Sequence, residues 1–371
     1  MKQPTTCKQK FLLLVTIFLI FLISYFMKNT MPKLTPICKS LLCKYLTQDI
    51  FNLLKDKKTT NNFTLLQAIN SGVENEDSGI GVYAGDEESY SLFSLLFDPI
   101  IKEYHGFSRS DKHKSNLNEN DLNAPNPDPK GEFILSTRIR VGRNIKNMPL
   151  GSAISKEQRL EVEKIVSTAL KNLDGELKGT YYPLLGMSKE INQQLIHDHF
   201  LFKAGDRFLK SAGLNRDWPE ARGIYHNYEK NFLVWINEED QLRIISMQEG
   251  GDIQEVFSRL VNAIKQIEKF ISFSYNDHLG YITSCPTNLG TAMRASVHIK
   301  LPKLSKEMKL FKQITDKYHL QIRGLHGEHS KDDSGIYDIS NQRRLGITEV
   351  QCVQDMYDGV QALIEKEKNI S

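Results

Sequence analysis

The sequence predicts an α+β fold, with a small all-helical N-terminal domain and a larger domain in which helices flank an antiparallel β-sheet. Three observations lead to this class. Strand-like segments come in pairs joined by short turns, which favours antiparallel pairing. Segments with apolar residues at helical spacing alternate with these pairs. A polar stretch at residues 108–131, with closely spaced prolines, divides a helix-rich part of the 371-residue chain from a strand-rich part.

The chain opens with an uncharged run, "FLLLVTIFLIFLISYFM", at residues 11–27. As a helix at ~1.5 Å per residue it would span roughly 26 Å, close to the ~30 Å of a bilayer core. No small-residue cleavage motif follows, so we expect residues 1–35 to be a hydrophobic segment of the signal-anchor type that associates with a membrane. Cleavage as a signal peptide and a translation start at Met27 or Met31 stay open. Orientation is also open, because lysines flank the run on both sides.

Residues 36–107 form the expected helical domain. Apolar residues recur at helical spacing in "CKSLLCKYL", "DIFNLL", "TLLQAI" and "SLFSLLFDPIIKEY". Between the last two lies "ENEDSGIGVYAGDEESY", residues 74–90, whose glycines and acidic residues predict an exposed loop. Residues 108–131 then form the expected linker.

Residues 132–371 form the expected larger domain, and its elements follow from the period of the apolar residues. A capping-box pair, Ser155 and Gln158, marks the start of its first helix. The predicted elements are a strand at 132–141, a helix at 155–173, two strands joined by an acidic turn at 231–247, a helix at 252–271, a strand–turn–strand unit at 281–301, strands at 320–324 and 335–341, and a helix at 348–368.

Composition excludes several classes of protein. The formal charge of +3 is small for this length, and no basic block carries interleaved aromatic residues, so no nucleic-acid partner is expected. The five cysteines are scattered without a CxxC pair or a His/Cys cluster. Neither a zinc site nor a disulfide framework is therefore expected, and the cysteine usage fits a reducing compartment.

Arginines lie on several strands of the expected sheet. Since residues i and i+2 of a strand share a face, Ser136, Arg138 and Arg140 point to one side of their strand. The same rule aligns Arg294 with His298 on another strand. His298 is either an ordinary buried histidine or lies against an adenine ring.

Two further strands contribute Arg243 and Arg323. A single arginine is usually solvated or ion-paired. Like charges stacked on one face are destabilising unless an anion lies between them. Because guanidinium groups bind phosphate oxygens bidentately, we predict a bound polyphosphate accompanied by Mg²⁺.

Groups of opposite character lie on loops beside these strands. Glu239 lies in the acidic turn, Glu328 in a later loop, and Cys285 precedes a proline in "ITSCPTNLGTAMRASVHI". An anionic cluster beside a cationic one predicts a substrate with a phosphate-like part and a cationic part. Cys285 is either a buried structural thiol or a thiol whose pKa the nearby arginines lower toward thiolate. Cys352, within the closing amphipathic helix, is assigned to structure.

Several long motifs, in order along the chain, resemble the phosphagen kinases: "STRIRVGR", "GTYYPLLGM", "DHFLFKAGDRFL", "WPEARGIYHN", "FLVWINEEDQLRIISMQEGGD", "CPTNLGTAMRASVHIKLPKL" and "YDISNQRRLGITE". The resemblance runs from about Cys38 to the C-terminus. It implies the phosphagen kinase, glutamine synthetase-like fold and a reversible phosphoryl transfer between ATP and a guanidino group, with ATP/ADP and Mg²⁺ as cofactors. It implies no protein ligand for the metal, since the ATP phosphates hold most of the Mg²⁺ coordination.

The resemblance also implies the site residues. The nucleotide-binding set is Ser136, Arg138, Arg140, His199, Arg243, Arg294, His298 and Arg323. The catalytic set, which also binds the guanidino group, is Glu239, Cys285 and Glu328. Glu239 is the candidate proton acceptor. Asp77 and Arg207 match a pair that bridges the two domains, and the linker and the loop near 325–335 are expected to move on closure.

The loop "DSGIGVYAGD" resembles the arginine kinase form of the family. Its substrate-binding positions are Ser78, Gly79, Ile80, Gly81, Val82 and Tyr83. A glycine-rich turn lets backbone N–H groups approach a substrate carboxylate closely. The resemblance therefore implies an arginine kinase that converts L-arginine and ATP to phosphoarginine and ADP, as an energy buffer.

Three alternatives remain. Departures from the family pattern at Gly85, Leu325 and His326 leave room for another acceptor, such as taurocyamine or lombricine. A protein arginine side chain is disfavoured, because the protein-directed relatives lack the helical domain. A catalytically silent, membrane-tethered nucleotide-binding scaffold is disfavoured, because every residue of both sets is present. The resemblance implies a monomer, and we expect its kinase domain in the cytoplasm.

Overall fold

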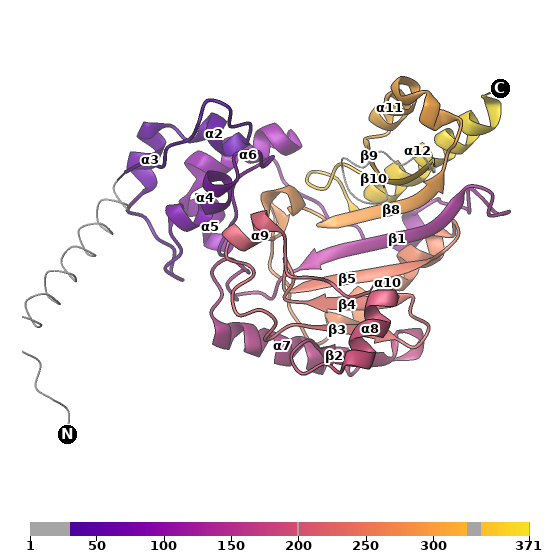
Figure 1. Ribbon diagram of the computed structural model, residues 1–371, viewed down its shortest axis with the longest axis horizontal. Coiled ribbons are helices and arrows are strands. Elements are labelled where there is room, and N and C mark those ends of the chain that lie inside the picture. Colours follow the sequence, from indigo (N-terminus) through magenta and orange to yellow (C-terminus); the bar gives the residue numbers. More distant parts are fainter. Residues whose placement is uncertain (1–29, 199, 325–334, 371) are drawn as a thin grey trace, which may run out of the picture.

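The computed structural model describes residues 30–198, 200–324 and 335–370 (Figure 1). A helical part lies at one end of the molecule, and a sheet with its covering helices makes up the rest. This arrangement confirms the predicted fold class. The predicted anchor at residues 11–27 lies outside the described residues. Within the described ranges, no helix is both long and apolar enough to cross a bilayer.

The helical part consists of short helices, four of which begin at a side chain that accepts hydrogen bonds from free backbone N–H groups. These capping residues are Ser40, Thr47, Thr64 and Asp86. The helices are α2 (Leu41–Tyr45), α3 (Gln48–Leu54), α4 (Leu65–Glu74), α5 (Glu87–Leu92) and α6 (Ser94–His105). Their hydrophobic cluster also includes Leu214, Ile282 and Leu345 of the larger part. The two parts therefore share a core.

The larger part is built on one sheet. Within the described residues the strand order is β2-β3-β4-β5-β1-β8-β10-β9, and every neighbouring pair is antiparallel. The strands are β1 (Ile134–Arg143), β2 (Gly179–Pro183), β3 (Gly223–Asn227), β4 (Phe232–Ile236), β5 (Leu242–Glu249), β8 (Met293–Lys300), β9 (Leu320–Gly324) and β10 (Ile336–Asn341), with β6 (Tyr275–Asn276) and β7 (Gly280–Tyr281) in a separate hairpin.

One face of the sheet is packed and the other is open. On β1, Thr137, Ile139 and Val141 are fully buried, whereas the residues between them are partly exposed. The helices of this part are α7 (Lys156–Leu170), α8 (Lys189–His197), α9 (Arg207–Ser211), α10 (Ile253–Ile267), α11 (Met308–Lys317) and α12 (Glu349–Asn369). Of these, α10 contacts β1 and β5, and α12 contacts β8 and β10. Alternation along β1 therefore leaves its arginines on the open face.

Most predicted elements are present, including β1, β4, β5, β8, β9, β10 and the helices α7, α10 and α12. The capping box of Ser155 and Gln158 is also present. The sequence analysis missed β2, β3, α8, α9 and α11. The two missed strands have five residues each, as do the predicted strands β4 and β9, so length alone does not explain the omission.

The prediction of an exposed loop at residues 74–90 is wrong for residues 80–86, all of which are buried. Gly81 (φ 78°) packs so closely that a Cβ there would lie 2.8 Å from the Cβ of Leu42. The N–H of Ala84 donates to the carbonyl of Ser284, in the larger part, at 2.8 Å. Gly81 thus permits close packing inside the helical part, and the backbone of Ala84 joins the loop to the larger part. Composition alone does not distinguish such a packed loop from an exposed one.

The linker at residues 108–131 is bonded to the larger part along its length. The hydroxyl of Ser115 and the N–H of Asn116 donate to the buried carboxylate of Glu349, at 3.0 and 2.8 Å. Asp128 accepts two backbone N–H groups at the start of β1, each at 2.7 Å. Its movement on closure stays a prediction.

Two cysteines form a disulfide bridge, Cys38 and Cys43, and this corrects the expectation of no disulfide. The short helix α2 brings their Cα atoms to 6.2 Å, within reach of a bridge. Cys285 and Cys352 are free and buried. Cys352 belongs to the main hydrophobic core, in agreement with the structural role predicted for it.

Candidate active site

The open face of the sheet gathers guanidinium groups from neighbouring strands. The register of β1 and β8 places Arg140 opposite Arg294, with Arg138 two residues along β1. On the other side of β1, Arg243 of β5 lies opposite Gly142. Side chains on directly opposed residues lie close together. The structure therefore brings together four of the five predicted phosphate-binding arginines.

This cluster is electrostatically unfavourable without an anion. Burial and the charges of Arg243 and Arg138 lower the pKa of Arg140 well below its usual value. Burial and the charges of Arg243 and Arg294 lower the pKa of Arg138 to about 10. Within the described residues neither Arg138 nor Arg140 has an ion pair, whereas Arg243 and Arg294 do. Both unpaired side chains are suited to an anionic ligand.

An aromatic ring supports two of these cations. The ring centre of Trp235 in β4 lies 5.6 Å from the Cζ of Arg138 and 5.5 Å from that of Arg243. The indole N–H donates to the carbonyl of Phe200 at 3.0 Å, which fixes the ring. Sequence analysis missed Trp235. The available signal was its position opposite Arg243 in the β4–β5 hairpin.

A second row of polar and charged side chains crosses the sheet beside the arginine cluster. Ser136, His298, Asp338 and Arg323 lie opposite one another on β1, β8, β10 and β9. The hydroxyl of Ser136 lies 3.3 Å from Nδ1 of His298. Asp338 accepts from Arg294 Nη2 at 2.9 Å. Burial opposes ionisation of Asp338, but its contacts with His298 and Arg294 outweigh burial and lower its pKa to about 2.

Sequence analysis missed Asp338. The available signal was the period of the strand, which places Asp338 and Ser340 on the same face of β10. Its carboxylate partly neutralises Arg294, so it lowers the repulsion inside the cationic cluster.

The turn between β4 and β5 supplies the opposing negative charge. Arg243 Nη2 donates to Glu239 Oε2 at 2.9 Å and lies 3.0 Å from Oε2 of Glu238. Burial disfavours the charge on Arg243, but the two carboxylates outweigh it and raise its pKa. Glu238 was not predicted, and it shares the arginine with the predicted Glu239.

The third acid of this turn, Asp240, connects it to the loop that carries Cys285. Its Oδ1 accepts from the amide of Asn144 at 2.8 Å and from the N–H of Ser284 at 3.0 Å. From the same loop, the amide of Asn288 approaches Glu239 Oε1 at 3.4 Å. These hydrogen bonds therefore hold the acidic turn next to the loop that carries Cys285.

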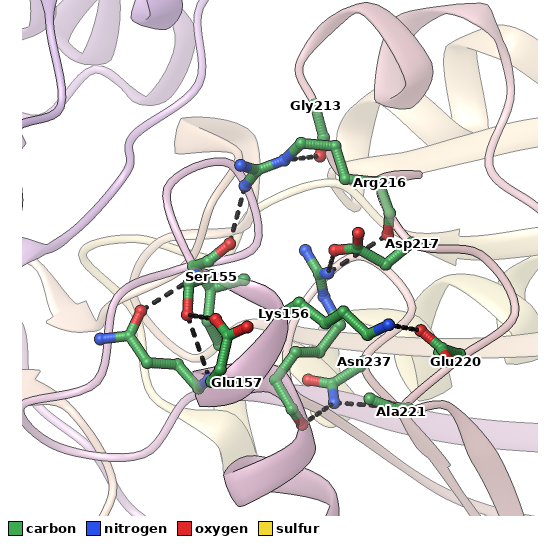
Figure 2. A network of polar contacts seen from close by, with 12 residues as sticks. Ser155, Lys156, Glu157, Gly213, Arg216, Asp217, Glu220, Ala221 and Asn237 are labelled. Carbon is green, nitrogen blue, oxygen red and sulfur yellow. Dashed lines mark hydrogen bonds and ion pairs between the residues drawn. The ribbon is translucent and has the colours of Figure 1, made fainter. Parts of the chain in front are cut away.

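Asn237 determines the backbone conformation just before Glu238 and Glu239. Its φ is 56°, a region that asparagine tolerates better than most residues. Its amide donates to the carbonyls of Ala221 at 2.7 Å and Arg159 at 3.1 Å. Figure 2 shows Asn237 beside Ala221 in this network, in which Arg159 also donates to Asp217 at 2.6 Å. The position of Glu239 thus depends on α7 and on the segment before β3.

The carboxyl of Glu239 is suited to proton exchange near neutral pH. Burial raises its pKa to about 7, against the opposing charge of Arg243, and the charge of Asp240 adds to the increase. A general base works best when its pKa lies near the working pH.

The environment of Cys285 corrects one expectation. Its thiol is 6% exposed and lies 3.1 Å from the hydroxyl of Thr287. Burial and the charge of Glu239 raise the pKa of Cys285 to about 12, although the contact with Thr287 opposes this. The expectation that arginines lower this pKa is wrong for the chain without ligands, because burial and, after it, the charges of Glu239 and Asp240 oppose ionisation of the thiol. A thiolate would form only with a cation beside it.

The predicted specificity loop, residues 78–83, reaches the acidic side of the site from the helical part. Burial raises the pKa of the Tyr83 hydroxyl, and the charges of Cys285 and Glu239 add to the increase. Ser78 is buried, and its hydroxyl has no hydrogen-bond partner among the described residues. Of these two hydroxyls, that of Tyr83 therefore lies within electrostatic range of Glu239 and Cys285.

A cavity of about 50 Å³ lies between the cationic and acidic groups. Its lining includes Arg140, Arg243, Arg294, Arg344, Glu239 and Asn288. A cavity of about 890 Å³ between β9 and α11 contains Arg323 but neither Glu239 nor Cys285, so we assign the chemistry to the smaller one. The predicted His199 and Glu328 lie outside the described residues, as do Leu325 and His326.

One ion pair crosses from the helical part to α9. Arg207 Nη1 donates to Asp77 Oδ1 at 2.8 Å, which agrees with the pairing that the resemblance implied. Both side chains are more than half exposed. The contribution of this pair to stability is therefore small, and its effect is on the relative position of the two parts.

Chemically, the site presents a cationic surface for a polyanion next to a carboxylate pocket for a planar cation. Among the described residues, no group of His, Cys, Asp and Glu side chains is arranged to hold a metal.

The sequence matches two models of one family. Residues 36–102 match the N-terminal domain of the ATP:guanido phosphotransferases, and residues 161–370 match their C-terminal catalytic domain. The arginine kinase Lit v 2 of Penaeus vannamei is 57% identical over 335 residues, which cover 90% of this chain and 94% of that protein. An arginine kinase of Anthopleura japonica is also 57% identical, over 91% of this chain and 47% of that protein.

Solved structures give the same result. The structure of a lombricine kinase superposes with a TM-score of 0.87 at 40% identity, covering 92% of this chain and 95% of that one. A duplicated taurocyamine kinase from Schistosoma mansoni, with bound transition state analog components, has a TM-score of 0.84 at 46% identity. It is matched over 89% of this chain and 46% of that chain.

Proposed function

This chain belongs to the ATP:guanido phosphotransferases, the phosphagen kinases, and on that premise we propose that it transfers the γ-phosphoryl group of ATP reversibly to free L-arginine, giving phosphoarginine and ADP. The observation that carries the proposal is the small cavity in which the guanidinium groups of the sheet face Glu239. The 57% identity to arginine kinases supports arginine as the acceptor.

The cationic face binds the nucleotide. Arg138, Arg140, Arg243 and Arg294 hold the phosphates, and Arg323 and His199 are assigned to the same set. Ser136 and His298 lie in the next row and contact the rest of the nucleotide. Mg²⁺ enters as its ATP complex and neutralises phosphate charge when bound. The fixed guanidinium groups then stabilise the charge that spreads over the phosphoryl group during transfer.

The acidic side binds and orients the acceptor. Glu239 and Glu328 hold the guanidinium group so that one nitrogen lies in line with the γ-phosphorus. The bond from this phosphorus to the bridging oxygen breaks, a P–N bond forms, and ADP leaves with the electron pair. The attacking nitrogen passes its proton to Glu239. Cys285 holds another guanidino nitrogen, and that bound cation favours its thiolate.

The helical domain selects the acceptor. Residues 78–83 offer backbone N–H groups and the hydroxyls of Ser78 and Tyr83 to the α-carboxylate of arginine. We assign residues 36–107 to this specificity domain, 108–131 to the linker and 132–371 to the catalytic domain. Exclusion of water on closure protects ATP from hydrolysis.

A coupled assay of ADP release, run with a panel of guanidino compounds, tests the acceptor. We expect kcat/KM for L-arginine to exceed the values for taurocyamine and lombricine by at least about 100-fold. Taurocyamine carries a sulfonate in place of the carboxylate, and the carboxylate of lombricine lies beyond a phosphodiester, so neither matches the spacing between guanidino group and carboxylate in arginine. Arginine methyl ester, which lacks the carboxylate charge, serves as the matched control and should react poorly. Higher kcat/KM for another compound would reassign the substrate, and inactivity with all of them would favour a silent scaffold.

The membrane tether remains a proposal that rests on residues 11–27. We expect full-length protein to sediment with membranes and a chain that starts at Met31 to stay in solution, because only the first carries the apolar segment. Fractionation with N-terminal sequencing measures this, and glycosidase treatment, which reports on the sequon at Asn62, distinguishes a lumenal from a cytoplasmic kinase domain. If the full-length sequence is expressed and the product is recovered in the soluble fraction with Met27 or Met31 as its first residue, the anchor is eliminated.

We propose a monomer, which gel filtration with light scattering tests.

A further inference from the structure

The disulfide bridge between Cys38 and Cys43 has no role in the proposed mechanism, although it belongs to the same helical part as the specificity loop, residues 78–83. Both bridged cysteines are partly exposed, whereas the free thiols of Cys285 and Cys352 are buried. Thiol–disulfide exchange depends on access to the sulfur atoms. The redox state of this bridge can therefore change in the folded protein.

The bridge closes a ring over residues 38–43, which include the start of helix α2. Helix α2 has only five residues, and a helix this short has little stability of its own. Inside the ring, the hydroxyl of Ser40 accepts from the N–H of Cys43 at 3.4 Å and so caps the helix. A cross-link limits the conformations that such a segment can adopt. The conformation of the ring therefore depends on the bridge.

Three backbone hydrogen bonds join the ring to the segment that contains the specificity loop. The donors are the N–H groups of Lys39, Leu41 and Leu42, and the acceptors are the carbonyls of Glu76, Gly79 and Ile80, at 3.1, 3.1 and 3.0 Å. Two of these acceptors lie within the specificity loop itself. The conformation of the loop is therefore tied to that of the ring.

Packing contributes little to the position of Gly79. A Cβ built on this glycine would meet no atom within 4 Å, so the hydrogen bond from Leu41 fixes the residue. Leu41 and Gly79 both line a cavity of about 390 Å³ between the helical part and the larger part. The loop thus has room to move at Gly79 once the ring no longer holds it.

The ring occupies carbonyl groups of the loop and leaves its N–H groups for a ligand. Among the described residues, no acceptor is found for the N–H groups of Gly79, Ile80, Gly81 and Val82. Successive free N–H groups of this kind bind an anion when the backbone holds them together. The proposed function assigns the α-carboxylate of the acceptor to them.

Peptide planarity connects the ring to these donors. The carbonyl of Gly79 and the N–H of Ile80 belong to one planar trans unit, in which they point in opposite directions. The same holds for the carbonyl of Ile80 and the N–H of Gly81. By holding the two carbonyls, the ring therefore directs the two N–H groups away from itself and fixes their direction.

We propose that the Cys38–Cys43 bridge is a redox-sensitive determinant of acceptor affinity: the oxidised chain binds the carboxylate of the acceptor more tightly than the reduced chain. A dithiol reductant passes two electrons and two protons to the bridge. The S–S bond breaks, one S–H bond forms on each cysteine, and the reductant becomes a disulfide. The opened ring releases the carbonyls of Gly79 and Ile80, and the N–H groups lose their fixed direction. The proposal deepens the proposed function and rests on it.

The first test compares kinetic constants before and after treatment with dithiothreitol, with mass spectrometry of the alkylated 38–43 peptide to report the state of the bridge. We expect reduction to raise KM for L-arginine at least about 5-fold and to change KM for ATP less than about 1.5-fold, because the sheet binds the nucleotide. KM for arginine methyl ester, which lacks the carboxylate charge, should be the same in both states. Reoxidation should restore the low KM for arginine.

Cys43→Ser removes the bridge permanently. The variant should have the KM for arginine of the reduced protein, and dithiothreitol should not change it. A response to dithiothreitol equal to that of the unaltered protein would overturn the proposal, because the reductant would then act elsewhere. If Cys43→Ser does not fold, Cys38→Ser carries the same comparison.

Two substitutions at Leu41 test the path from the ring to the loop. Leu41→Pro removes the N–H that donates to Gly79 and keeps both cysteines. Proline is tolerated there, because Leu41 is the first residue of α2 and Ser40 before it is extended, with φ −70° and ψ 153°. We expect oxidised Leu41→Pro to raise KM for arginine at least about 3-fold, whereas Leu41→Ala, which keeps the N–H, should stay within about 1.5-fold. Equal KM values in the two variants would overturn the proposal.

Hydrogen exchange measures the contact between ring and loop without any need for activity. The N–H groups of Lys39, Leu41 and Leu42 should exchange at least about 5-fold faster after reduction, and those of strand β8 should not change. Equal exchange in both states would overturn the proposal. A KM for ATP that rises in parallel with KM for arginine would also overturn it, since the bridge would then act on stability in general. Inactivity of the oxidised, unaltered protein would instead refute the proposed function, and hydrogen exchange would still decide whether the bridge controls the loop.

Discussion

Arg140→Met is expected to remove phosphoryl transfer and, at the same time, to raise the free energy of unfolding of the protein without ligands. The Arg140 guanidinium lies among other arginines and has no ion pair within the described residues. Burial and the like charges around it lower its pKa. Methionine fills similar volume without charge, so we expect stabilisation on the order of 1 kcal/mol. Loss of one fixed phosphate donor should lower kcat about 10³-fold.

Arg243→Met is the matched control, and its effect on stability should have the opposite sign. Arg243 contacts both Glu238 and Glu239, so its removal leaves two part-buried carboxylates without their cation. We expect destabilisation of about 3 kcal/mol, together with a comparable loss of activity. Urea unfolding without nucleotide measures the first effect and the coupled assay the second. A lower free energy of unfolding for Arg140→Met than for the unaltered protein would show that the cluster is not strained.

The contrast between these two arginines shows how far the sequence could predict the site. Alternation along β1 correctly predicted that Arg138 and Arg140 share the open face, because a strand has a fixed period of two. This inference depends only on residues that are close in sequence.

Contacts between residues that are far apart in the sequence were not predictable in this way. Asp338 reaches Arg294 only because β10 pairs with β8, and Arg344 reaches Thr287 only because the chain after β10 returns to the cysteine loop. No local period encodes either contact.

Burial was the second limit. The loop before α5 has the composition of a solvent-exposed turn, yet it is packed between the two parts of the molecule. Cys285 was expected to respond to the arginines, yet its pKa follows its burial and the nearby Glu239. In both cases the deciding quantity was the exposed surface in the folded chain, which depends on packing between segments distant in the sequence.

Glu239→Gln should have the largest effect of any single change on the acidic side of the site. The amide keeps the size of the side chain but neither accepts a proton nor neutralises a guanidinium group. We expect kcat to fall about 10²- to 10⁴-fold, with KM for ATP nearly unchanged because the nucleotide lies on the arginine face. Glu239→Asp, which keeps the charge on a shorter side chain, is the control and should lose less activity. An unchanged kcat in Glu239→Gln would exclude Glu239 as proton acceptor.

The pH dependence provides a second test of Glu239, with a sign that follows from its raised pKa. In the unaltered protein the carboxyl must be ionised to bind and deprotonate the acceptor, so kcat/KM for arginine should rise with pH up to about 7 and then level off. A bound guanidinium favours the carboxylate, so the inflection in kcat should lie at lower pH.

The contribution of Glu239 to the free energy of unfolding should change with pH in the direction opposite to kcat/KM. Because the pKa of Glu239 is raised on folding, the folded chain binds more protons than the unfolded chain between its ordinary pKa and about 7, and this group reduces stability as pH rises through that window. Glu239→Gln removes the penalty. Its free energy of unfolding, relative to the unaltered protein, should therefore be greater at pH 8 than at pH 5 in urea titrations without ligands. A difference that is the same at both pH values would show that Glu239 is already ionised at pH 5, and another group would then have to account for the inflection in kcat/KM.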